Sequence, residues 1–593
     1  MRKNFTFWDK KGEVSEKKCN FALRNPKPIT MYKKLFVTAM MTAACLQAGA
    51  QTLGSDYKSS NGNPISASVF CADPTAIDYN GRLYVYGTND HQQYIKNGKK
   101  NSNGYGNIKS LVVFSTDDMV NWTFHGTIDV GKVCTWAGNS WAPSAVWRTT
   151  ANGTEEFFVY FANGGGSVGV MKSTTSPLGP FKSPNSQAMI RHGMAGVDPC
   201  NWVFDPGAVI DSTGQGWIAF GGGDPQSSGS KLWPGNSRIA KLSSSMTSIS
   251  GSAKNMPAPY LFEASELNII GGRFVYTYNT SWSDRNDWSK FEKRNGQSAP
   301  SSCSMCYMVS DTPLDPDSWE YRGEYVPNEG NFGMGWGNNH THLHKFQGKY
   351  YLFYHSELLL QDMKGKGEAD NSAGGYRSIG VNVATVNEKT QKINKMTLNK
   401  TGAAAIKNLN PYDLQEAETM ANSGSVSYED FTNISKNTSI SSLGNDASRN
   451  LQVKMKAGAW TQLRKVDFGT VGADSFMIRA KGTGTLEIRL TRTGKAVATI
   501  DCSSTTFTDQ KIKVDPSVFK GVKTSMYLVC TSATNFYVDA WQFSEPQPDA
   551  IKVPYAAPKE DDGVMFDLNG RRLNSHSNGR GLYIQNGKKV LVK

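Results

Sequence analysis

The chain is poor in cysteine, and the cysteines that it has are scattered. Seven of the nine lie after residue 50, an odd number without regular spacing, which argues against a disulfide framework. Cys303 and Cys306 form a C-x-x-C motif, but no second pair accompanies it, as a structural zinc site requires, and no βαβ pattern surrounds it, as in a thiol redox motif. We therefore expect buried thiols or a local pair at these two positions.

The chain has little net charge over most of its length, although the whole sequence carries a net charge of +13. Residues 1–50 hold ten Lys and Arg against three Asp and Glu, and residues 555–593 hold seven against four, which leaves only +3 between them. A nucleic-acid partner requires a basic patch on the folded body. The composition therefore gives little support to nucleic-acid binding.

The chain also lacks an apolar stretch long enough to stay in a membrane. The apolar run at 35–46 follows two lysines and precedes small residues, so that residues 31–50 have the three sections of a signal peptide. This predicts a secreted or cell-surface protein without a transmembrane segment. Residues 1–30 are polar and basic, and we interpret them as an upstream extension from a start codon assigned too early, with Met31 as the true start. A cytoplasmic N-terminal tail is the alternative.

Aromatic residues make up 11% of the chain, glycine is frequent and helical heptads are few, which favours an all-β protein. One unit recurs five times: a polar or acidic residue, an apolar strand, a turn with glycine and an aromatic-rich strand. The units begin at Asp73, Ala142, Asp205, Glu263 and His340, spaced by 69, 63, 58 and 77 positions. This spacing is too irregular for a solenoid but suits blades joined by variable loops, so we predict a five-bladed β-propeller over residues 60–405.

In a propeller the innermost strand of each blade points its end at the central channel, so equivalent residues of the five units converge. Three of them, Asp73, Asp205 and Glu263, are carboxylic acids that precede apolar strands. Hydrolysis of a sugar acetal requires one carboxylic acid to protonate the leaving oxygen and one carboxylate to activate water or attack carbon. A lone Asp-Pro pair is otherwise a turn opener, but the register that the three share favours a catalytic site.

Five ordered motifs within residues 60–405 carry a likeness to a known family. They are Ala72-Asp73-Pro74, Ser140-Trp141-Ala142-Pro143, Val203-Phe204-Asp205-Pro206-Gly207, Phe262-Glu263-Ala264-Ser265, and Asn339-His340 with Tyr350-Tyr351-Leu352-Phe353-Tyr354-His355. Together they resemble the blade motifs of glycoside hydrolase family 43. The resemblance implies a five-bladed propeller and an inverting enzyme that acts on arabinose- and xylose-containing polymers of the plant cell wall.

The resemblance also implies a role for each carboxylate: Asp73 as general base, Glu263 as general acid, and Asp205 as the third carboxylate, which tunes the pKa of the acid and orients it. Residues 260–262 are apolar or aromatic, so burial and the charge of Asp205 are expected to raise the pKa of Glu263 and keep it protonated. Asp73 is expected across the sugar, with an inverting gap of about 6.5–9.5 Å that leaves room for water. Glu266 is the alternative acid, but strand alternation predicts that it lies on the opposite face from Glu263.

Further positions match motifs of the family or suit the site. Trp141 is interpreted as a stacking surface for a sugar ring, although a tryptophan before Ala-Pro is also a good core anchor. His340 matches a histidine that in many members binds a central calcium ion or helps to shape the site, and whether His342 is also a ligand stays open. Arg377 matches an arginine that approaches the site, with a surface ion pair as the alternative.

The pocket rim and its flanking motifs give the expected substrate. Asp224 and Asn339 are predicted at the rim. The motifs around Asp205 and Glu263, with the glycines at 221–223, resemble the arabinoxylan arabinofuranohydrolase branch more than the xylosidase or endo-arabinanase branches. We therefore predict removal of α-L-arabinofuranosyl side chains from arabinoxylan. A β-xylosidase or arabinanase of the same family is one alternative, and a non-catalytic glycan-binding propeller, against which three intact carboxylates argue, is the other.

The blade pattern stops near residue 411, and residues 412–545 have the length and alternating strands of a β-sandwich (jelly-roll) domain. Its marks are Glu416-Ala417-Glu418, Ala459-Trp460 before Val466-Asp467-Phe468-Gly469, and Asn535-Phe536-Tyr537-Val538-Asp539. They resemble carbohydrate-binding module family 6. The resemblance implies a structural calcium ion held by Glu416, Glu418 and Asp539, which oxygen ligands suit. A solvated acidic strand end is the alternative.

Sugar binding in that family uses aromatic faces and an asparagine. Asn535 matches the asparagine, and Phe507 takes the position of a stacking tryptophan, although phenylalanine is a poorer platform. The loop at 438–450 lacks the usual aromatic partner. Trp541 is assigned to the core rather than to a platform.

The end of the chain departs from both domains. Residues 546–562 are predicted to be a linker. Within residues 563–593, the segments 564–572 and 581–590 resemble the C-terminal sorting signal of the type IX secretion route, which implies delivery to the cell surface or the medium. A small β-hairpin without such an address is the alternative.

Overall fold

The structure of the chain is a computed structural model, which describes residues 53–225, 230–434, 449–546, 565–566, 581–585 and 588–592. The expected upstream extension and signal peptide lie outside the described residues, as do nearly all of the linker and much of the C-terminal segment. Within the described part of the chain, no helix combines the length and the apolar character needed to cross a membrane.

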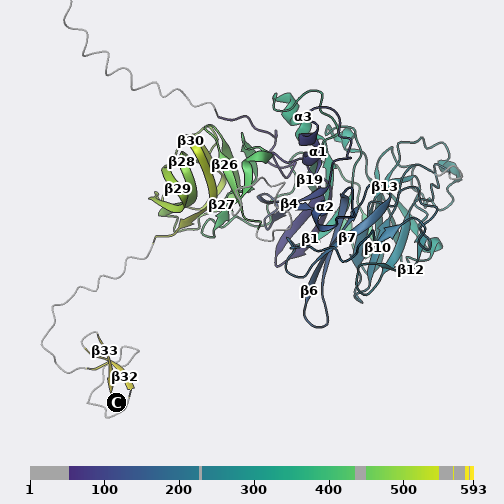
Figure 1. Cartoon of the computed structure of the whole chain (residues 1–593), viewed down its shortest axis with the longest axis horizontal. Coiled ribbons are helices and arrows are strands. Elements are labelled where there is room, and N and C mark those ends of the chain that lie inside the picture. Colours follow the sequence, from purple (N-terminus) through teal and green to yellow (C-terminus); the bar gives the residue numbers. More distant parts are fainter. Residues whose placement is uncertain are drawn as a thin grey trace, which may run out of the picture. The chain divides into compact units, whose positions relative to one another are not determined.

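Five antiparallel sheets follow one another along residues 72–384 and form the blades of a propeller (Figure 1). Blade 1 contains β1 (Ala72–Tyr79), β2 (Arg82–Thr88), β3 (Ser110–Thr116) and β4 (Trp122–Asp129). Blade 2 contains β5 (Trp141–Thr149), β6 (Glu155–Ala162), β7 (Ser167–Ser173) and β8 (Ile190–Arg191). Blade 3 contains β9 (Gly207–Ile210), β10 (Gly216–Phe220), β11 (Arg238–Leu242) and β12 (Ile249–Asn255). Blade 4 contains β13 (Leu261–Ile270), β14 (Arg273–Thr280), β15 (Met305–Ser310) and β16 (Glu320–Val326), and blade 5 contains β17 (His342–Phe346), β18 (Lys349–Ser356) and β19 (Ser378–Ala384).

The prediction of an all-β propeller is confirmed, because each of the five repeated units forms the first two strands of one blade. Short elements fill the connections: α1 (Asp90–Lys96), α2 (Val130–Val133), α3 (Leu358–Gly365), η1 (Trp288–Lys290), η2 (Pro316–Ser318) and η3 (Glu329–Phe332). A two-stranded sheet of β20 (Val386–Asn387) and β21 (Lys392–Ile393) follows blade 5.

Three inner hairpins close with turns that their sequence specifies. Asn80-Gly81, Gly271-Gly272 and Gln347-Gly348 have positive φ at both residues, between 47° and 84°. This backbone defines a type I′ turn, whose twist matches the flanking strands and which glycine adopts without strain. The hairpins β1–β2, β13–β14 and β17–β18 are therefore fixed locally.

Hydrogen bonds between side chains and the backbone join the innermost strands around the ring. Four alanine N–H groups donate to a neighbouring blade: Ala76 to His342 Nε2 (2.9 Å), Ala145 to Thr75 Oγ1 (3.1 Å), Ala208 to Ser144 Oγ (2.9 Å) and Ala264 to Asp205 Oδ2 (2.9 Å). At the junction of blades 4 and 5, the Thr341 hydroxyl donates to Thr277 Oγ1 (3.4 Å). These bonds satisfy buried polar groups and fix how far each strand reaches into the channel.

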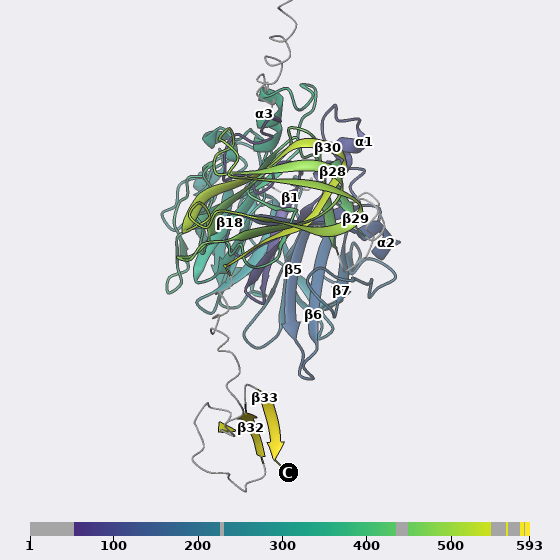
Figure 2. The same cartoon turned by 90° about the vertical axis from the view of Figure 1, so that its left-hand side faces the viewer.

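Residues 415–544 are called the C-terminal β region. It contains β22 (Gln415–Glu416), β23 (Thr419–Met420), β24 (Asn422–Gly424), η4 (Tyr428–Asp430), β25 (Phe431–Asn433), β26 (Leu451–Met455), β27 (Trp460–Asp467), β28 (Ser475–Arg489), β29 (Ala498–Lys513) and β30 (Val522–Ser544). The 23-residue strand β30 pairs with β22, β26, β27 and β28, and β28 lies between β29 and β30 (Figure 2). Trp460 and Trp541 are both buried, so each belongs to the core.

A short strand of the C-terminal β region, β23, adds to the sheet of blade 1. Strand β23 pairs with β4, with Met420 opposite Trp122. The Asn121 amide donates to Arg464 O (2.9 Å) and accepts from Arg464 N–H (2.8 Å).

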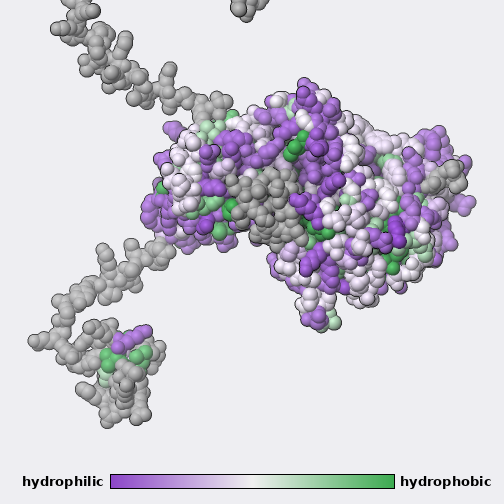
Figure 3. Space-filling view, in the orientation of Figure 1, coloured by the Kyte–Doolittle hydropathy of each residue, from purple (hydrophilic) through white to green (hydrophobic). Residues whose placement is uncertain are grey.

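The surface in view is largely hydrophilic, with only small apolar areas between polar ones (Figure 3). Near the end of the chain, β31 (Met565–Phe566), β32 (Gly581–Gln585) and β33 (Lys588–Val592) form a sheet of their own.

Candidate active site

One cavity of about 180 Å³ receives side chains from all five blades. It is lined by Asp73, Tyr105, Trp141, Trp202, Phe204, Asp205, Phe262, Glu263, Asn338, His340 and Arg377. The three carboxylates that the repeat pattern singles out therefore meet in one place. The aromatic lining leaves them a largely apolar surrounding.

A shared backbone irregularity turns these residues into the cavity. Asp73, Ala142 and Asp205 have φ of 48°, 39° and 44°, and in blade 4 the residue after Glu263, Ala264, has φ of 63°. The strand register shifts beside them in blades 1, 2 and 4. Positive φ is uncommon outside glycine, and a bulge re-aims the side chains near it. The repeated unit thus contains a bulge at the position where its leading residue meets the channel.

Asp73 is held as an ionised carboxylate. Its Oδ1 accepts from Arg377 Nη1 (2.8 Å) and its Oδ2 from the Thr88 hydroxyl (2.6 Å). Burial alone would raise the pKa of Asp73, but the charge of Arg377 and the neighbouring His355 together outweigh burial and hold the pKa well below its ordinary value. His355 supports the backbone here, since Asp73 N–H donates to its Nδ1 (3.1 Å) and its Nε2 lies 2.7 Å from Asn338 O.

Arg377 is itself clamped from behind by Asp90. Arg377 Nε and Nη2 donate to the two carboxylate oxygens of Asp90 at 2.9 Å each, and the Arg377 backbone N–H donates to Asp90 Oδ2 at 3.0 Å. Asp90 is fully buried, and the guanidinium lies 5.0 Å from the centre of the Tyr105 ring. A bidentate pair of this kind fixes the plane of the guanidinium, so Arg377 presents a fixed donor to Asp73.

The pKa values of Asp205 and Glu263 are both shifted in the opposite direction, upward. Burial, and then the charge of Asp73, raise the pKa of Asp205 to about 7. Burial, followed by the charges of Asp205 and Asp73, raises the pKa of Glu263 well above its ordinary value. Glu263 lines the cavity, and its Oε1 is buried without a hydrogen-bond partner among the described residues. One cavity therefore holds an ionised carboxylate and a protonated carboxylic acid, the pair that acetal hydrolysis requires.

The alternative acid, Glu266, is not among the residues that line the cavity. It is buried, and its Oε2 lies 3.3 Å from His342 Nδ1. His342 in turn accepts from the Ala76 N–H, so this pair joins blades 1, 4 and 5. His340 does line the cavity, with Nδ1 3.6 Å from Asp73 Oδ1, and burial lowers the pKa of His340 to about 3, which keeps it neutral.

Trp141 and Arg377 both lie at the cavity, as the sequence predicts. Trp141 lines the cavity and donates from Nε1 to Tyr105 O (3.2 Å). Arg377 is 8% exposed and bound to Asp73 and Asp90, so the alternative of a surface ion pair is wrong for it.

The two residues predicted at the rim, Asn339 and Asp224, are not among those that line the cavity. Asn339 turns away from the cavity, because its amide donates to Cys303 O (3.0 Å), and the preceding Asn338 lines the cavity instead. Asp224 is exposed and does not line the cavity. Its backbone oxygen accepts hydrogen bonds from the side-chain amides of Asn201 and Asn236. Both residues lie in loops, where a shift of one position or an unforeseen local hydrogen bond decides which side chain faces the ligand.

Sequence reasoning missed several residues of the site. Trp202, Phe204 and Phe262 line the cavity, and the last two flank Asp205 and Glu263 in the motifs, which is a signal that could have identified them. Tyr105 and Asp90 have no such signal, because they come from the connection between β2 and β3. Cys303 and Cys306 are buried free thiols, so the expectation of buried thiols is confirmed and that of a local pair is wrong.

The predicted sugar-binding residues of the C-terminal β region lie on either side of β28. Phe507 is in β29, and the Lys481 ammonium lies 4.8 Å from the centre of its ring and 5.0 Å from that of Tyr537. Asn535 is exposed in β30, has φ of 48°, and its backbone oxygen contacts the Gly482 backbone so closely that a side chain there would not fit. The irregular pairing of both neighbours with β28 therefore brings these residues to one part of the sheet.

The predicted calcium ligands Glu416, Glu418 and Asp539 are close enough to influence one another electrostatically. Burial and then the charge of Glu416 raise the pKa of Glu418 well above its ordinary value. Asp539 Oδ2 pairs with Arg479 Nε (3.0 Å). Glu418 Oε2 and Asp539 Oδ1 are buried and have no hydrogen-bond partner among the described residues, which suits an oxygen-coordinated cation. The described residues contain no group of three His, Cys, Asp or Glu side chains already arranged to hold a metal ion.

A five-bladed propeller with a protonated and an ionised carboxylate in one cavity has the pair of groups that a glycoside hydrolase uses. Residues 61–372 match the family described as glycosyl hydrolases family 43. The arabinoxylan arabinofuranohydrolase of Paenibacillus polymyxa is 34% identical over 82% of this chain and 74% of its own length, and that of Bacillus subtilis (strain 168) is 33% identical over 82% and 93%. The chain belongs to glycoside hydrolase family 43.

A solved structure supports the same conclusion. The crystal structure of a family 43 arabinoxylan arabinofuranohydrolase from Bacillus subtilis, in complex with cellotetraose, is 31% identical and covers 84% of this chain and 99% of its own, with a TM-score of 0.71. The protein is therefore a glycosidase with a hemicellulose-degrading activity.

Proposed function

We propose that the enzyme removes α-L-arabinofuranosyl side chains from arabinoxylan with inversion at the anomeric carbon. The observation that carries the proposal is the opposite protonation of two carboxyl groups in one cavity, Asp73 ionised and Glu263 protonated. The two relatives named arabinoxylan arabinofuranohydrolase support the choice of sugar and polymer.

In the proposed reaction, Glu263 donates its proton to the glycosidic oxygen as the bond from that oxygen to the anomeric carbon breaks. Asp73 accepts a proton from a water molecule, whose oxygen attacks the anomeric carbon from the opposite face. The products are arabinose with inverted configuration and the debranched chain, and water later restores both protonation states. Asp205 keeps Glu263 protonated by its charge, and Arg377 keeps Asp73 ionised and oriented.

The test compares wheat arabinoxylan, linear arabinan and xylo-oligosaccharides side by side, with the anomer of the first product read by proton NMR. We expect arabinose from arabinoxylan as the preferred reaction and its β-anomer as the initial product. Asp73→Asn and Glu263→Gln should each lower kcat by about 10²–10⁴-fold. Release of xylose as the preferred reaction, or full activity of Asp73→Asn, would contradict the proposal.

We further propose that the C-terminal β region is a carbohydrate-binding module that holds a structural calcium ion through Glu416, Glu418 and Asp539. The unpartnered buried oxygens of Glu418 and Asp539 support it, as does a match to relatives that extends well beyond the family range of residues 61–372. Chelation should lower the melting temperature of the full chain, and added Ca²⁺ should restore it, because a ligand bound only by the folded state stabilises that state. Asp539→Asn should lose this response, and a melting temperature indifferent to Ca²⁺ would refute the site.

We also propose that the enzyme is exported through the signal peptide at 31–50 and directed outward by the sorting signal at 563–593, to act on plant cell-wall polysaccharide. The sequence pattern supports this, and the segments lie largely outside the described residues. N-terminal sequencing of the mature protein should begin after Ala50. A protein that retains residues 31–50 in the cytoplasm would contradict export.

A further inference from the structure

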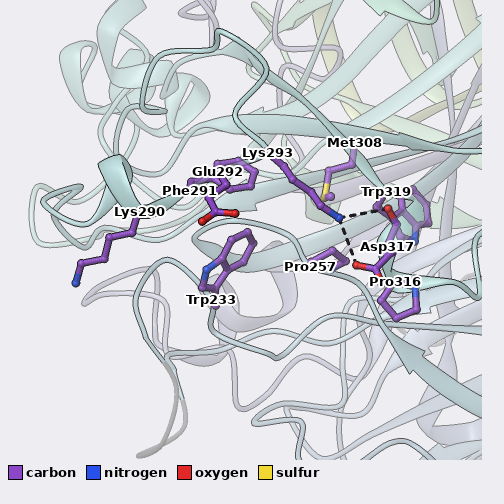
Figure 4. A pocket seen from close by; sticks show the side chains of 10 residues that line it. All are labelled: Trp233, Pro257, Lys290, Phe291, Glu292, Lys293, Met308, Pro316, Asp317 and Trp319. Atoms are coloured by element: carbon purple, nitrogen blue, oxygen red, sulfur yellow. Dashed lines mark hydrogen bonds and ion pairs between the residues drawn. The ribbon is translucent and has the colours of Figure 1, made fainter.

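A second cavity, of about 340 Å³, lies beside blade 4 and is not lined by Asp73, Asp205 or Glu263. Ten residues line it: Trp233, Pro257, Lys290, Phe291, Glu292, Lys293, Met308, Pro316, Asp317 and Trp319. None of them lines the active site. Figure 4 shows Trp233 at one side of the cavity and the Lys293–Asp317 pair at the other. Its size falls within the range of about 300–1,000 Å³ that is usual for small-molecule sites.

Trp233 is an exposed aromatic surface in a fixed position. Its side chain is 39% exposed, and its ring meets Phe291 edge-on at 5.0 Å and 85°. The loop around it is held by the Trp233 N–H bond to Ser230 Oγ (2.9 Å) and the Leu232 N–H bond to Asp287 Oδ2 (3.2 Å). A preordered aromatic ring costs little entropy when a ligand stacks on it.

The polar groups of the cavity suit a neutral ligand with many hydroxyls. Two lysines, Lys290 and Lys293, are balanced by Glu292 and Asp317, and Lys293 Nζ lies 3.3 Å from Asp317 Oδ1. Balanced charges give no net attraction for an anion or a cation, but they offer hydrogen-bond donors and acceptors. An aromatic face combined with such groups is the pattern that binds the apolar face and the hydroxyls of a sugar ring.

One wall of the cavity belongs to the active-site end of the propeller, whereas Pro316, Asp317 and Trp319 come from the β15–β16 connection at the opposite end. Trp233 lies in the β10–β11 connection, which leaves the propeller at the end where Asp205 precedes β9, because β9 and β10 are antiparallel. Tyr260, which is three residues before Glu263, donates from its backbone N–H to Leu232 O (3.0 Å). Pro257 in the cavity wall is six residues before Glu263, so the chain between them spans at most about 20 Å.

The exposed tryptophans of the described residues all lie at the active-site end of the propeller. Trp233, Trp282 and Trp336 are exposed by 39%, 46% and 62%, and all three lie in connections that leave the active-site end. We propose that the Trp233 cavity is an accessory site for the neutral β-1,4-linked main chain of the polysaccharide, a site that binds a stretch of polymer away from the scissile side chain. This inference rests on the proposed function for its choice of polymer.

The test measures binding and turnover separately in the full chain. The binding probe is linear, unbranched xylohexaose, measured by calorimetry in a Phe507→Ala background, which removes the stacking ring of the C-terminal β region. Trp233→Ala should weaken binding by about tenfold, and Trp233→Phe, which keeps an aromatic face, should retain most of it. On wheat arabinoxylan, Trp233→Ala should raise KM and leave kcat unchanged, while kcat/KM on p-nitrophenyl α-L-arabinofuranoside stays at the wild-type value.

Each outcome decides for or against the accessory site. Wild-type affinity of Trp233→Ala for xylohexaose, or absence of xylohexaose binding in the parent protein, would overturn it. Equal loss on the polymer and on the small arabinoside, with an unchanged melting temperature, would assign Trp233 to the active site instead. Because binding of xylohexaose requires no cleavage, failure of the accessory site is distinguishable from failure of the proposed arabinofuranosidase activity, which the small arabinoside reports.

Discussion

At the residue scale, the site depends on groups that set the charge of the two catalytic carboxyls. Asp73 is ionised because a clamped arginine lies against it, and Glu263 is protonated because it is buried beside two other carboxyls. Neither state is a property of an isolated side chain. Substitution of the residues that create these states should therefore change the activity, as should substitution of the carboxyls themselves.

Asp90→Asn should lower activity without any contact between residue 90 and the sugar. The change removes one of the two charges that Arg377 pairs with and loosens a bidentate contact. Hydrogen bonds to charged groups contribute about 1.5–3 kcal/mol, and each 1.4 kcal/mol corresponds to about a tenfold change, so we expect kcat/KM to fall by about 10–100-fold. The acid limb of the pH profile should also move upward, because a less oriented Arg377 lowers the pKa of Asp73 less.

The control is Asp117→Asn, which breaks only partly exposed pairs with Arg82 and Lys407 and should leave activity unchanged. Steady-state kinetics and thermal unfolding of both variants provide the comparison. Wild-type kcat/KM in Asp90→Asn would show that the clamp plays no part in orienting Arg377.

Asp205→Asn should shift the alkaline limb of the pH profile to lower pH. Glu263 acts as the protonated acid, so activity is lost as pH rises through its pKa, and the charge of Asp205 contributes to raising that pKa. Removing the charge lowers the pKa and hence the limb, while the acid limb, set by Asp73, stays. The profile of kcat/KM on an aryl arabinoside measures this, and an alkaline limb that stays in place or moves upward would refute the role of Asp205.

At the scale of elements, the close approach of β9 and β13 sets the distance between Asp205 and Glu263. A Cβ on Gly207 would lie 2.4 Å from Ser265 O and 2.5 Å from Glu266 Cα, both backbone atoms that cannot move aside alone. The type I′ turns of the inner hairpins could be predicted from their Asn-Gly and Gly-Gly sequences. The bulges that aim the carboxylates could not, because alanine and aspartate at positive φ carry no sequence signal.

Gly207→Ala should therefore push the two strands apart and lower both stability and activity. Overpacking of this kind costs about 1–3 kcal/mol, which corresponds to a fall of roughly several degrees in melting temperature. Gly365→Ala at the end of α3 is the matched control, because no atom lies within 4 Å of its added Cβ, and it should leave both quantities unchanged. Calorimetry and kinetics on the two variants decide the matter, and equal behaviour of the pair would contradict the steric argument.

At the scale of the whole molecule, the C-terminal β region packs against blade 1, which carries Asp73, and against α1. The Tyr428 ring stacks on His91 in α1, with centroids 4.2 Å apart and planes at 13°, and Phe431 meets Phe124 of β4 edge-on at 5.1 Å. His91 follows Asp90, the residue that clamps Arg377. A contact from the C-terminal β region thus reaches Asp73 through α1.

A chain truncated after residue 405 should unfold at lower temperature and be prone to aggregate, because it exposes Trp122, Phe124 and the free edge of β4. Tyr428→Ala is the milder test, because it removes the stacking on His91 without deleting a strand. We expect it to lower kcat/KM on a small aryl arabinoside by about two- to tenfold, from a loss of about 0.5–1.5 kcal/mol of aromatic contact. Unchanged kinetics of Tyr428→Ala would limit the role of the region to stability or polymer binding.

The sequence by itself determined the features that depend on neighbours along the chain. Strand alternation, Gly-bearing turns and the carboxylates at the head of the units in blades 1, 3 and 4 specified five blades and brought Asp73, Asp205 and Glu263 to the fore. These signals are local, because the shape of a hairpin and the face of a strand are set by adjacent residues. A propeller is largely built from such hairpins, so most of its architecture could be read in advance.

Only the tertiary structure decided which partners surround these carboxylates at the axis. Arg377 reaches Asp73 across 304 positions, Asp90 clamps it from a helix, and Asn338 rather than Asn339 faces the cavity. Ring closure brings these residues together, and burial then sets their protonation. Contacts of such sequence separation depend on how all five blades pack, which no local pattern contains.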